Sequence, residues 1–297
     1  MAFSYIGGKS KIGPSLIIPN IPTDIETYVE PFSGAYWVYF KMDINDYPNL
    51  KTIVYNDYNK LNYNLFNCMR TPELLLEECE KLTYQKKGES PTPPECSQTF
   101  YDAQKELFAE GFEPGIMDYE SAAKYVYLLT NVFSGGNPIK SKFIDLKGKY
   151  HSKYFSFMNK LKDPKWIEKF KKITFVENMD FEDVIKKYDS PTTYFYADPP
   201  YYKTETYYAN HEFGIETHQR LANCLKSIKG RFSLSYYDFP QLSEWFPKDE
   251  YVWKSKAFNK AAMAKAGEKQ SVGVELLIMN YSINEPKKVE EKEESEI

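Results

Sequence analysis

The segment YFYADPPYY at residues 194–202 decides the fold class of this chain. Its first four residues are aromatic or apolar in succession, which is typical of a strand that is buried on both faces of a sheet. The two prolines that follow lack backbone N–H groups, so the strand must end near Asp198. Ligands of open α/β sheets bind just beyond the carboxyl ends of the strands. The turn Asp198-Pro199-Pro200-Tyr201 is therefore expected to face a ligand.

Other short β-rich runs place this strand in a larger sheet. ETYV at 26–29 and TIVY at 52–55 are expected strands with a helix over 35–42 between them. Further strands are expected at 173–176, 193–197, 231–235, 250–253 and 274–280, a buried helix at 120–130 and an amphipathic helix at 216–230. This alternation predicts a doubly wound, Rossmann-like α/β sheet, and the helical pattern from 59 to about 130 predicts a mainly helical insert.

Turns after the first two expected strands carry candidate ligand contacts. In EPFSGAYW at 30–37, Gly34 allows a tight turn that a ligand can approach closely, and the helix that follows favours an anion. In YND at 55–57, Asp57 stands where an acid holds ribose hydroxyls in dinucleotide-binding folds. A phosphate-binding GxGxxG motif does not accompany it, which favours a nucleoside cofactor without a pyrophosphate, such as S-adenosylmethionine. Taken singly, each turn is better explained as a plain strand-to-helix turn or a cap.

The DPPY turn also predicts a type of chemistry. Asp198 and the Pro199 carbonyl can both accept hydrogen bonds from a planar amine. Such contacts favour the pyramidal form of the amine and direct its lone pair at a methyl donor. Tyr201 can stack on a base, and a stacked base is worth ~1–3 kcal/mol. The alternative is a plain Pro-Pro turn between two elements.

The charge is distributed unevenly along the 297 residues, although the net charge is only −4. Residues 73–120 hold twelve acids and four lysines, whereas residues 140–172 hold eleven lysines and three acids. A lysine-rich block of this kind suits contacts with phosphates. A solvated helix face explains the same block equally well.

Several classes of protein are disfavoured. No apolar run approaches the roughly 20 residues that span a bilayer, and the first residues lack the apolar core of a secretory signal, so we expect a cytoplasmic protein without membrane contact. The cysteines form no CxxC pair and the histidines form no HxxxH pattern, so we expect no metal site and buried thiols. A cysteine nucleophile served by histidine is the less favoured alternative. The acidic stretch 285–297 is expected to be a disordered tail.

The three segments, in this order, resemble the Dam-type family of DNA adenine N6-methyltransferases over most of residues 3–282. YIGGKSK at 5–11 matches the aromatic-x-Gly-Gly-Lys motif of that family, and EPFSGA at 30–35 matches its cofactor loop. Four further stretches also resemble it, namely NVFSGG at 131–136, KFIDLKGKY at 142–150, ENMDFEDVI at 177–185 and VELLIMNY at 274–281.

The resemblance implies a class I methyltransferase that uses S-adenosylmethionine, flips an adenine out of double-stranded DNA and produces N6-methyladenine and S-adenosylhomocysteine. It implies catalytic roles for Asp198, Pro199, Pro200 and Tyr201, cofactor contacts from Tyr5, Lys9, Glu30, Phe32, Gly34, Asp57 and Asp198, and DNA contacts from Asn131, Ser134, Asn137, Lys140 and Lys142. We expect a catalytic domain over 1–65 and 176–284 and a target-recognition insert over 66–175. The sequence does not determine the oligomeric state or whether a restriction endonuclease counterpart exists.

The chain also departs from the family pattern. Tyr36 stands at the second glycine of the cofactor loop, where it is expected to crowd or redirect the methionine arm of the cofactor. An arginine expected near Asn137 and Lys140 is missing. Two alternatives stay open: a methyltransferase for another planar amine (an RNA base or a protein glutamine), and a DNA-binding relative without activity. The separation of 164 positions from Gly34 to Asp198 leaves room for a recognition domain, and the intact DPPY favours an active enzyme.

Overall fold

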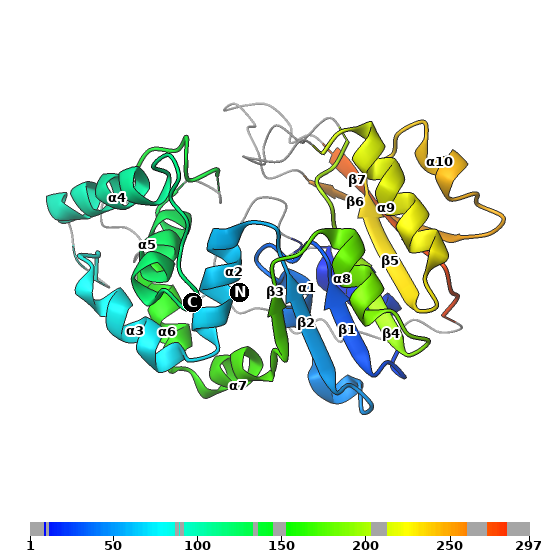
Figure 1. Cartoon of the computed structure of the whole chain (residues 1–297), viewed down its shortest axis with the longest axis horizontal. Coiled ribbons are helices and arrows are strands. Elements are labelled where there is room, and N and C mark those ends of the chain that lie inside the picture. The colour runs from blue at the N-terminus through cyan, green and yellow to red at the C-terminus, as the bar shows by residue number, and fades with distance from the viewer. Residues whose placement is uncertain are drawn as a thin grey trace.

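The structure, a computed structural model, describes residues 9, 12–86, 89, 92–132, 136–144, 153–202, 213–259 and 272–283. A seven-stranded sheet in the order β3-β2-β1-β4-β5-β7-β6 crosses the molecule (Figure 1). Its strands are β1 (Thr27–Glu30), β2 (Thr52–Asn56), β3 (Phe175–Glu177), β4 (Thr193–Ala197), β5 (Arg231–Tyr236), β6 (Val252–Asn259) and β7 (Val272–Met279). Strand β7 runs antiparallel to β5 and β6, and the pairs from β3 to β5 are all parallel. The expected Rossmann-like α/β sheet is confirmed.

The register of the central strands brings the three sequence segments to one edge of the sheet. Strand β1 pairs with both β2 and β4, so Val29 lies beside Val54 on one side and Phe195 on the other. The turns that follow these parallel strands therefore leave the sheet together at its carboxyl edge. Strand β6 is longer than the expected 250–253, because its pairing with β7 continues to Asn259.

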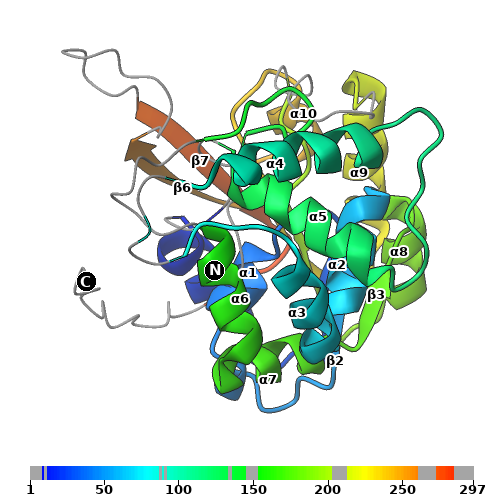
Figure 2. The same cartoon turned by 90° about the vertical axis from the view of Figure 1, so that its left-hand side faces the viewer.

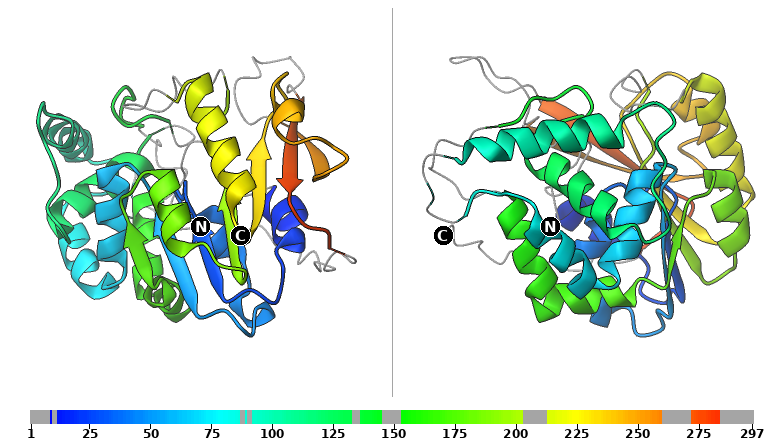
Figure 3. Two further views of the ribbon diagram at one scale, coloured as in Figure 1. Left: turned by 45° about the vertical axis from the view of Figure 1, so that its right-hand side comes forward. Right: turned by 60° about the vertical axis from the view of Figure 1, so that its left-hand side comes forward.

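Helices cover both faces of the sheet (Figure 1, Figure 3). On one face lie α8 (Phe181–Tyr188), α9 (Ile215–Ser227) and α10 (Leu242–Trp245), which pack on side chains such as Phe195 and Phe232. On the other face lie α1 (Trp37–Lys41), η1 (Gly13–Ile17) and η2 (Ile18–Asn20), beside Tyr28 and Tyr194, and the short η3 (Ile44–Asp46) follows α1. The alternation of neighbouring residues between the two faces is the period of two that strands impose.

A group of helices lies beside β3, between β2 and β3 in the chain (Figure 1, Figure 2). It comprises α2 (Lys60–Met69), α3 (Pro72–Lys81), α4 (Pro94–Leu107), α5 (Tyr119–Thr130), α6 (Lys153–Lys162) and α7 (Pro164–Lys172). Helix α5 is buried along almost its whole length, which confirms the helix expected at 120–130. Its buried side chains belong to the same hydrophobic cluster as Tyr28 and Tyr55 of the sheet, so the two parts of the molecule share a core.

The lysine-rich block does not form one surface. Helix α7 leads into the amino end of β3, so it lies at the edge opposite the carboxyl ends of the strands, at the bottom of Figures 1 and 2. There Lys169 Nζ donates to the carbonyl oxygens of Phe40 and Met42, at 2.7 and 2.9 Å, and so caps the end of α1. This lysine has a structural role, whereas Lys140 and Lys142 lie in the exposed loop after α5.

Candidate active site

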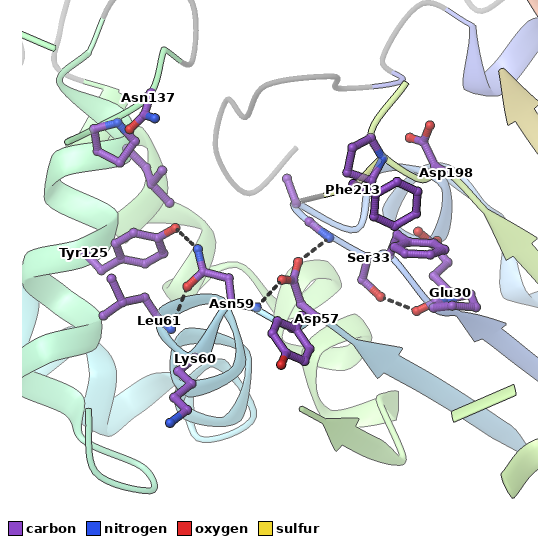
Figure 4. A pocket seen from close by; sticks show the side chains of 18 of the residues that line it. Glu30, Ser33, Asp57, Asn59, Lys60, Leu61, Tyr125, Asn137, Asp198 and Phe213 are labelled. Carbon is purple, nitrogen blue, oxygen red and sulfur yellow. Dashed lines mark hydrogen bonds between the residues drawn. The ribbon is translucent and has the colours of Figure 1, made fainter. Parts of the chain in front are cut away.

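A cavity of about 920 Å³ opens at the carboxyl edge of the sheet, between the strand ends and the helices α4 and α5 (Figure 4). One wall comes from the turns after β1, β2, β3 and β4, and the opposite wall comes from residues 107–114, 136–139 and two side chains of α5. The side chains that line the cavity include Lys9, Glu30, Phe32, Asp57, Asn137, Asp180, Phe181, Asp198 and Phe213.

Asp198 sits in a cluster of buried polar groups. The Lys9 ammonium lies 2.8 Å from Asp198 Oδ1 and 3.5 Å from Glu275 Oε1, and it also stands 4.8 Å from the centre of the Tyr201 ring. The Tyr201 hydroxyl contacts Asp198 Oδ1 at 3.0 Å and also contacts Glu275 Oε1. The Asp198 side chain is 19% exposed, so it is the carboxyl of this cluster that reaches the cavity.

A third buried carboxyl, that of Glu30, lies close to this cluster. Its Oε1 accepts a hydrogen bond from the Tyr28 hydroxyl at 2.6 Å and from the Tyr39 backbone N–H at 3.3 Å. Burial raises the pKa of Glu30 well above its ordinary value, and the charge of Asp198 contributes in the same direction. Burial also raises the pKa of Asp198, although Lys9 opposes that shift. The carboxyl groups of Glu30 and Asp198 and the ammonium of Lys9 therefore meet at the floor of the cavity.

The turn after β1 presents its backbone to the cavity and its aromatic side chain to the core. Gly34 and Tyr36 both have left-handed backbone angles, with φ of 51° and 56°, so α1 begins at Trp37 and not at 35. For a tyrosine this conformation costs about 1–2 kcal/mol. The ring of Tyr36 is fully buried, stacks on Tyr39 and donates its hydroxyl to the Val54 carbonyl at 3.0 Å. Of the two effects expected of Tyr36, crowding is not seen, because its side chain does not line the cavity.

Asp57 holds this turn against the start of α2. Its Oδ2 accepts from the Gly34 backbone N–H at 2.9 Å and from the Asn62 amide at 3.0 Å, and its Oδ1 accepts from the Asn59 backbone N–H at 2.8 Å (Figure 4). Burial raises the pKa of Asp57 to about 6, against the lowering effect of these donors. The carboxyl lines the cavity, and Oδ1, which accepts only one of these bonds, is the oxygen with acceptor capacity left beyond them.

Three aromatic rings form an apolar part of the cavity. Of these, only Phe32 is among the contacts predicted from sequence. Phe32 lies 5.5 Å from Phe181 and 5.8 Å from Phe213, between ring centres. Asp180 precedes Phe181 and caps α8 by accepting from the Glu182 backbone N–H. The motif at 177–185 predicts this turn but does not single out Asp180 and Phe181 as contacts. A polar residue followed by an aromatic residue just after β3 is the sequence pattern that indicates them.

Buried amides join the turns at the strand ends. The Asn56 amide donates to the Pro31 carbonyl at 2.8 Å and to the Met179 carbonyl at 3.1 Å, and its Oδ1 accepts from the Met179 N–H. One side chain thus connects the turns after β1 and β3. Sequence reasoning missed Asn56 because an asparagine at a strand end is typical of any turn. It also missed Glu275, whose strand was expected but whose partners are far away in sequence.

The opposite wall contains the loop that follows α5. Asn137 faces the cavity, while Lys140 and Lys142 are exposed beside it. The Gln104 amide of α4 donates to the carbonyls of Pro138 and Ser141, at 2.6 and 3.1 Å, and so fixes the path of this loop. Asn131, in contrast, is buried at the end of α5 and donates its amide to the Tyr127 carbonyl.

Two predicted contacts, Tyr5 and Ser134, lie outside the described residues, as does the tail at 285–297. Within the described ranges no cluster of three or more His, Cys, Asp or Glu side chains could hold a metal ion. In the same part of the chain no helix is long and apolar enough to cross a membrane. The four cysteines are buried, as expected, and burial raises the pKa of Cys68 and that of Cys79 to about 12.

A protein-family model covers most of the chain. The model of the D12 class N6 adenine-specific DNA methyltransferases matches residues 5–262, a span that contains the turns after β1 and β2, the helical segment and the DPPY turn. No curated protein matched the chain. Because the family model covers most of the 297 residues, the chain belongs to the D12 class of N6 adenine-specific DNA methyltransferases.

Proposed function

We propose that the cavity holds S-adenosylmethionine together with an adenine that has been flipped out of double-stranded DNA. The products are then N6-methyladenine and S-adenosylhomocysteine. The observation that carries this proposal is the meeting of Asp198, the Gly34 turn and Asp57 around one cavity at the carboxyl edge of the sheet. Flipping costs a few kcal/mol, because the target amine cannot be reached inside a duplex.

The cavity fits the chemistry of this cofactor. A sulfonium and an α-amino group are cationic, and the carboxyl oxygens of Glu30 and Asp198 line the cavity, where they can face these groups. Rings of Phe32, Phe181 and Phe213 suit a purine, and Asp57 is placed to accept from ribose hydroxyls. When bound, S-adenosylmethionine supplies the electrophilic methyl group.

The DPPY turn acts on the target amine by orientation. Asp198 Oδ1 is engaged by Lys9 and Tyr201, and among the described residues no group bonds its Oδ2. That oxygen and the Pro199 carbonyl accept the two N6 hydrogens, and this arrangement keeps the nitrogen lone pair directed at the methyl donor. Strong general-base catalysis is not required, because the amine loses its proton readily after the methyl group has been transferred.

The helical segment between β2 and β3 is proposed as the target-recognition region. Residues 136–139 of its loop line the cavity wall opposite Asp198, and the exposed Lys140 and Lys142 follow them in the chain, so we expect a nucleotide entering the cavity to pass this loop. We assign base contacts to Asn137 and phosphate contacts to the two lysines. Asn131 is left out of this set, because its side chain is buried and already bonded within α5.

The test is direct. Purified full-length protein is incubated with duplex DNA and S-adenosylmethionine labelled in its methyl group, and the digested nucleosides are analysed by mass spectrometry. We expect label in N6-methyladenine, and sequencing of the methylated DNA then gives the target site. Label in RNA or in protein glutamine would support the alternative substrates, and binding of DNA without transfer would support an inactive relative. The cytoplasmic location and an endonuclease counterpart stay predictions.

A further inference from the structure

The Tyr201 hydroxyl lies between two carboxyl oxygens. It is 3.0 Å from Asp198 Oδ1, and it makes a closer contact with Glu275 Oε1. The Lys9 ammonium contacts the same two oxygens from its own side, at 2.8 and 3.5 Å. The four groups form a closed ring in which two carboxyl oxygens alternate with a hydroxyl and an ammonium.

The number of protons in this ring determines which groups are charged. A tyrosine hydroxyl carries one proton, so it can donate to only one of the two carboxyl oxygens. The other contact becomes a hydrogen bond only when that carboxyl is itself protonated and donates to the Tyr201 oxygen. Both contacts are therefore hydrogen bonds when one of the two carboxyl groups is protonated and the other is ionised.

The surroundings of the two carboxyl groups decide where this proton resides. Asp198 is closer to the Lys9 ammonium and reaches the cavity, whereas the Glu275 side chain is only 2% exposed. A nearby cation and access to solvent favour the ionised form, and burial favours the neutral form. Asp198 is therefore the carboxylate, and the proton belongs to Glu275.

We propose that Glu275 is held as a neutral carboxylic acid that donates a hydrogen bond to Tyr201, and that Tyr201 in turn donates to Asp198. The consequence for catalysis rests on the proposed function: Asp198 then meets the target amine as an anion whose second oxygen is directed by this chain of donors. Glu275 lies behind Tyr201 and does not touch the substrate, so it is a positioning residue.

The groups that face Glu275 from neighbouring elements are consistent with this state. Burial raises the pKa of Glu275 above its ordinary value. The Lys9 ammonium opposes that shift, and the negative charge of Asp198 adds to it. Tyr196 of β4 and Tyr237 after β5 are uncharged neighbours. On β6, Lys256 is the cross-strand partner of Glu275, but its side chain is exposed.

The sign of a stability change tests the proposal. Glutamine resembles a neutral glutamic acid in shape and keeps an N–H donor for Tyr201. A glutamate that is neutral when folded but ionised when unfolded, with an ordinary pKa of about 4.3, makes the protein less stable as pH rises above that value. Glu275→Gln escapes this penalty, so its Tm should equal the wild-type Tm near pH 4 and exceed it near pH 8 by roughly 2–4 °C.

An ionised Glu275 paired with Lys9 predicts the opposite sign, a lower Tm for Glu275→Gln near pH 8, and that result would overturn the proposal. Glu250→Gln is the matched control, because Glu250 is exposed and the same substitution there should give no difference that depends on pH. Neither measurement requires methyl transfer, so a failure of the proposed function would not be confused with a failure here.

Infrared spectroscopy gives a second, independent readout on the folded wild-type chain. Protein labelled with carbon-13 in its glutamate carboxyl groups should show a protonated-carboxyl band at neutral pH, to which Glu30 also contributes because burial raises its pKa. Glu275→Gln should remove part of this band, and a band of unchanged intensity in Glu275→Gln would refute the neutral acid, whatever the effect of the substitution on stability.

Discussion

The two walls of the cavity are built differently. The wall at the strand ends consists of turns whose carboxyl and amide side chains are buried and bonded to one another, as Asp57 and Asn56 show. The opposite wall includes a loop whose backbone carbonyls accept hydrogen bonds from the Gln104 side chain, and Lys140 and Lys142 of this loop are exposed. We infer that the first wall provides chemistry that tolerates little change. The second wall provides recognition that can vary.

The largest effect is expected at the centre of the first wall. Asp198→Ala removes the acceptor that orients the target amine, so methyl transfer should fall by about 10³-fold or more. Single-turnover assays with labelled cofactor measure this loss, while the far-UV circular dichroism should stay unchanged. Retained activity would contradict the role assigned to Asp198.

A smaller effect is expected at Asp57. Loss of a hydrogen bond to a charged group costs about 1.5–3 kcal/mol, so Asp57→Ala should weaken cofactor binding by roughly 10- to 100-fold with little change in DNA affinity. Equal losses for both ligands would show that Asp57 instead supports the whole cavity.

The same carboxyl predicts a pH dependence of cofactor binding. The pKa of Asp57 is raised to about 6, so the group becomes protonated as pH falls below that value and then loses acceptor capacity. Calorimetric titration of wild-type protein should show weaker cofactor binding below about pH 6, and Asp57→Asn should remove this change. Because the folded pKa exceeds the ordinary 3.9, the contribution of this group to stability decreases as pH rises from roughly 4 to 6.

A modest effect is expected at the second wall. Lys140→Ala should weaken DNA binding about equally for all sequences and reduce the slope of log affinity against log salt by about 1, because one phosphate contact is lost. Fluorescence anisotropy over a range of salt concentrations measures that slope. An unchanged slope would show that Lys140 does not contact a DNA phosphate.

The smallest effect separates the two parts of the lysine-rich block. Lys169→Met keeps the aliphatic stem of the side chain but removes the bonds to the Phe40 and Met42 carbonyls, which should reduce the free energy of unfolding by about 1–2 kcal/mol. Because Lys169 lies at the far edge of the sheet, DNA affinity should not change. Weaker DNA binding would show that the duplex also contacts this edge.

Most of the fold could be predicted from sequence because strands and turns are local signals. Strand β4 and the turn at Asp198 are apparent from apolar residues followed by two prolines. Contacts between residues far apart in sequence could not be predicted in this way. Glu275 reaches Tyr201 across 74 positions, and a lysine at 169 looks the same in sequence whether it binds phosphate or caps α1. The motif at 131–136 predicts a DNA contact for Asn131, but the side-chain amide of this residue donates to the Tyr127 carbonyl at the end of α5.

The left-handed Tyr36 has a consequence for how the cofactor turn responds to its ligand. Its ring is fixed among core residues and its hydroxyl is bonded to β2, so the folding of the sheet itself imposes the shape of the Gly34 turn. The entropy of ordering that turn is then lost during folding and not again during binding. Such preorganisation predicts that the empty and the loaded enzyme share one backbone path from Glu30 to Trp37.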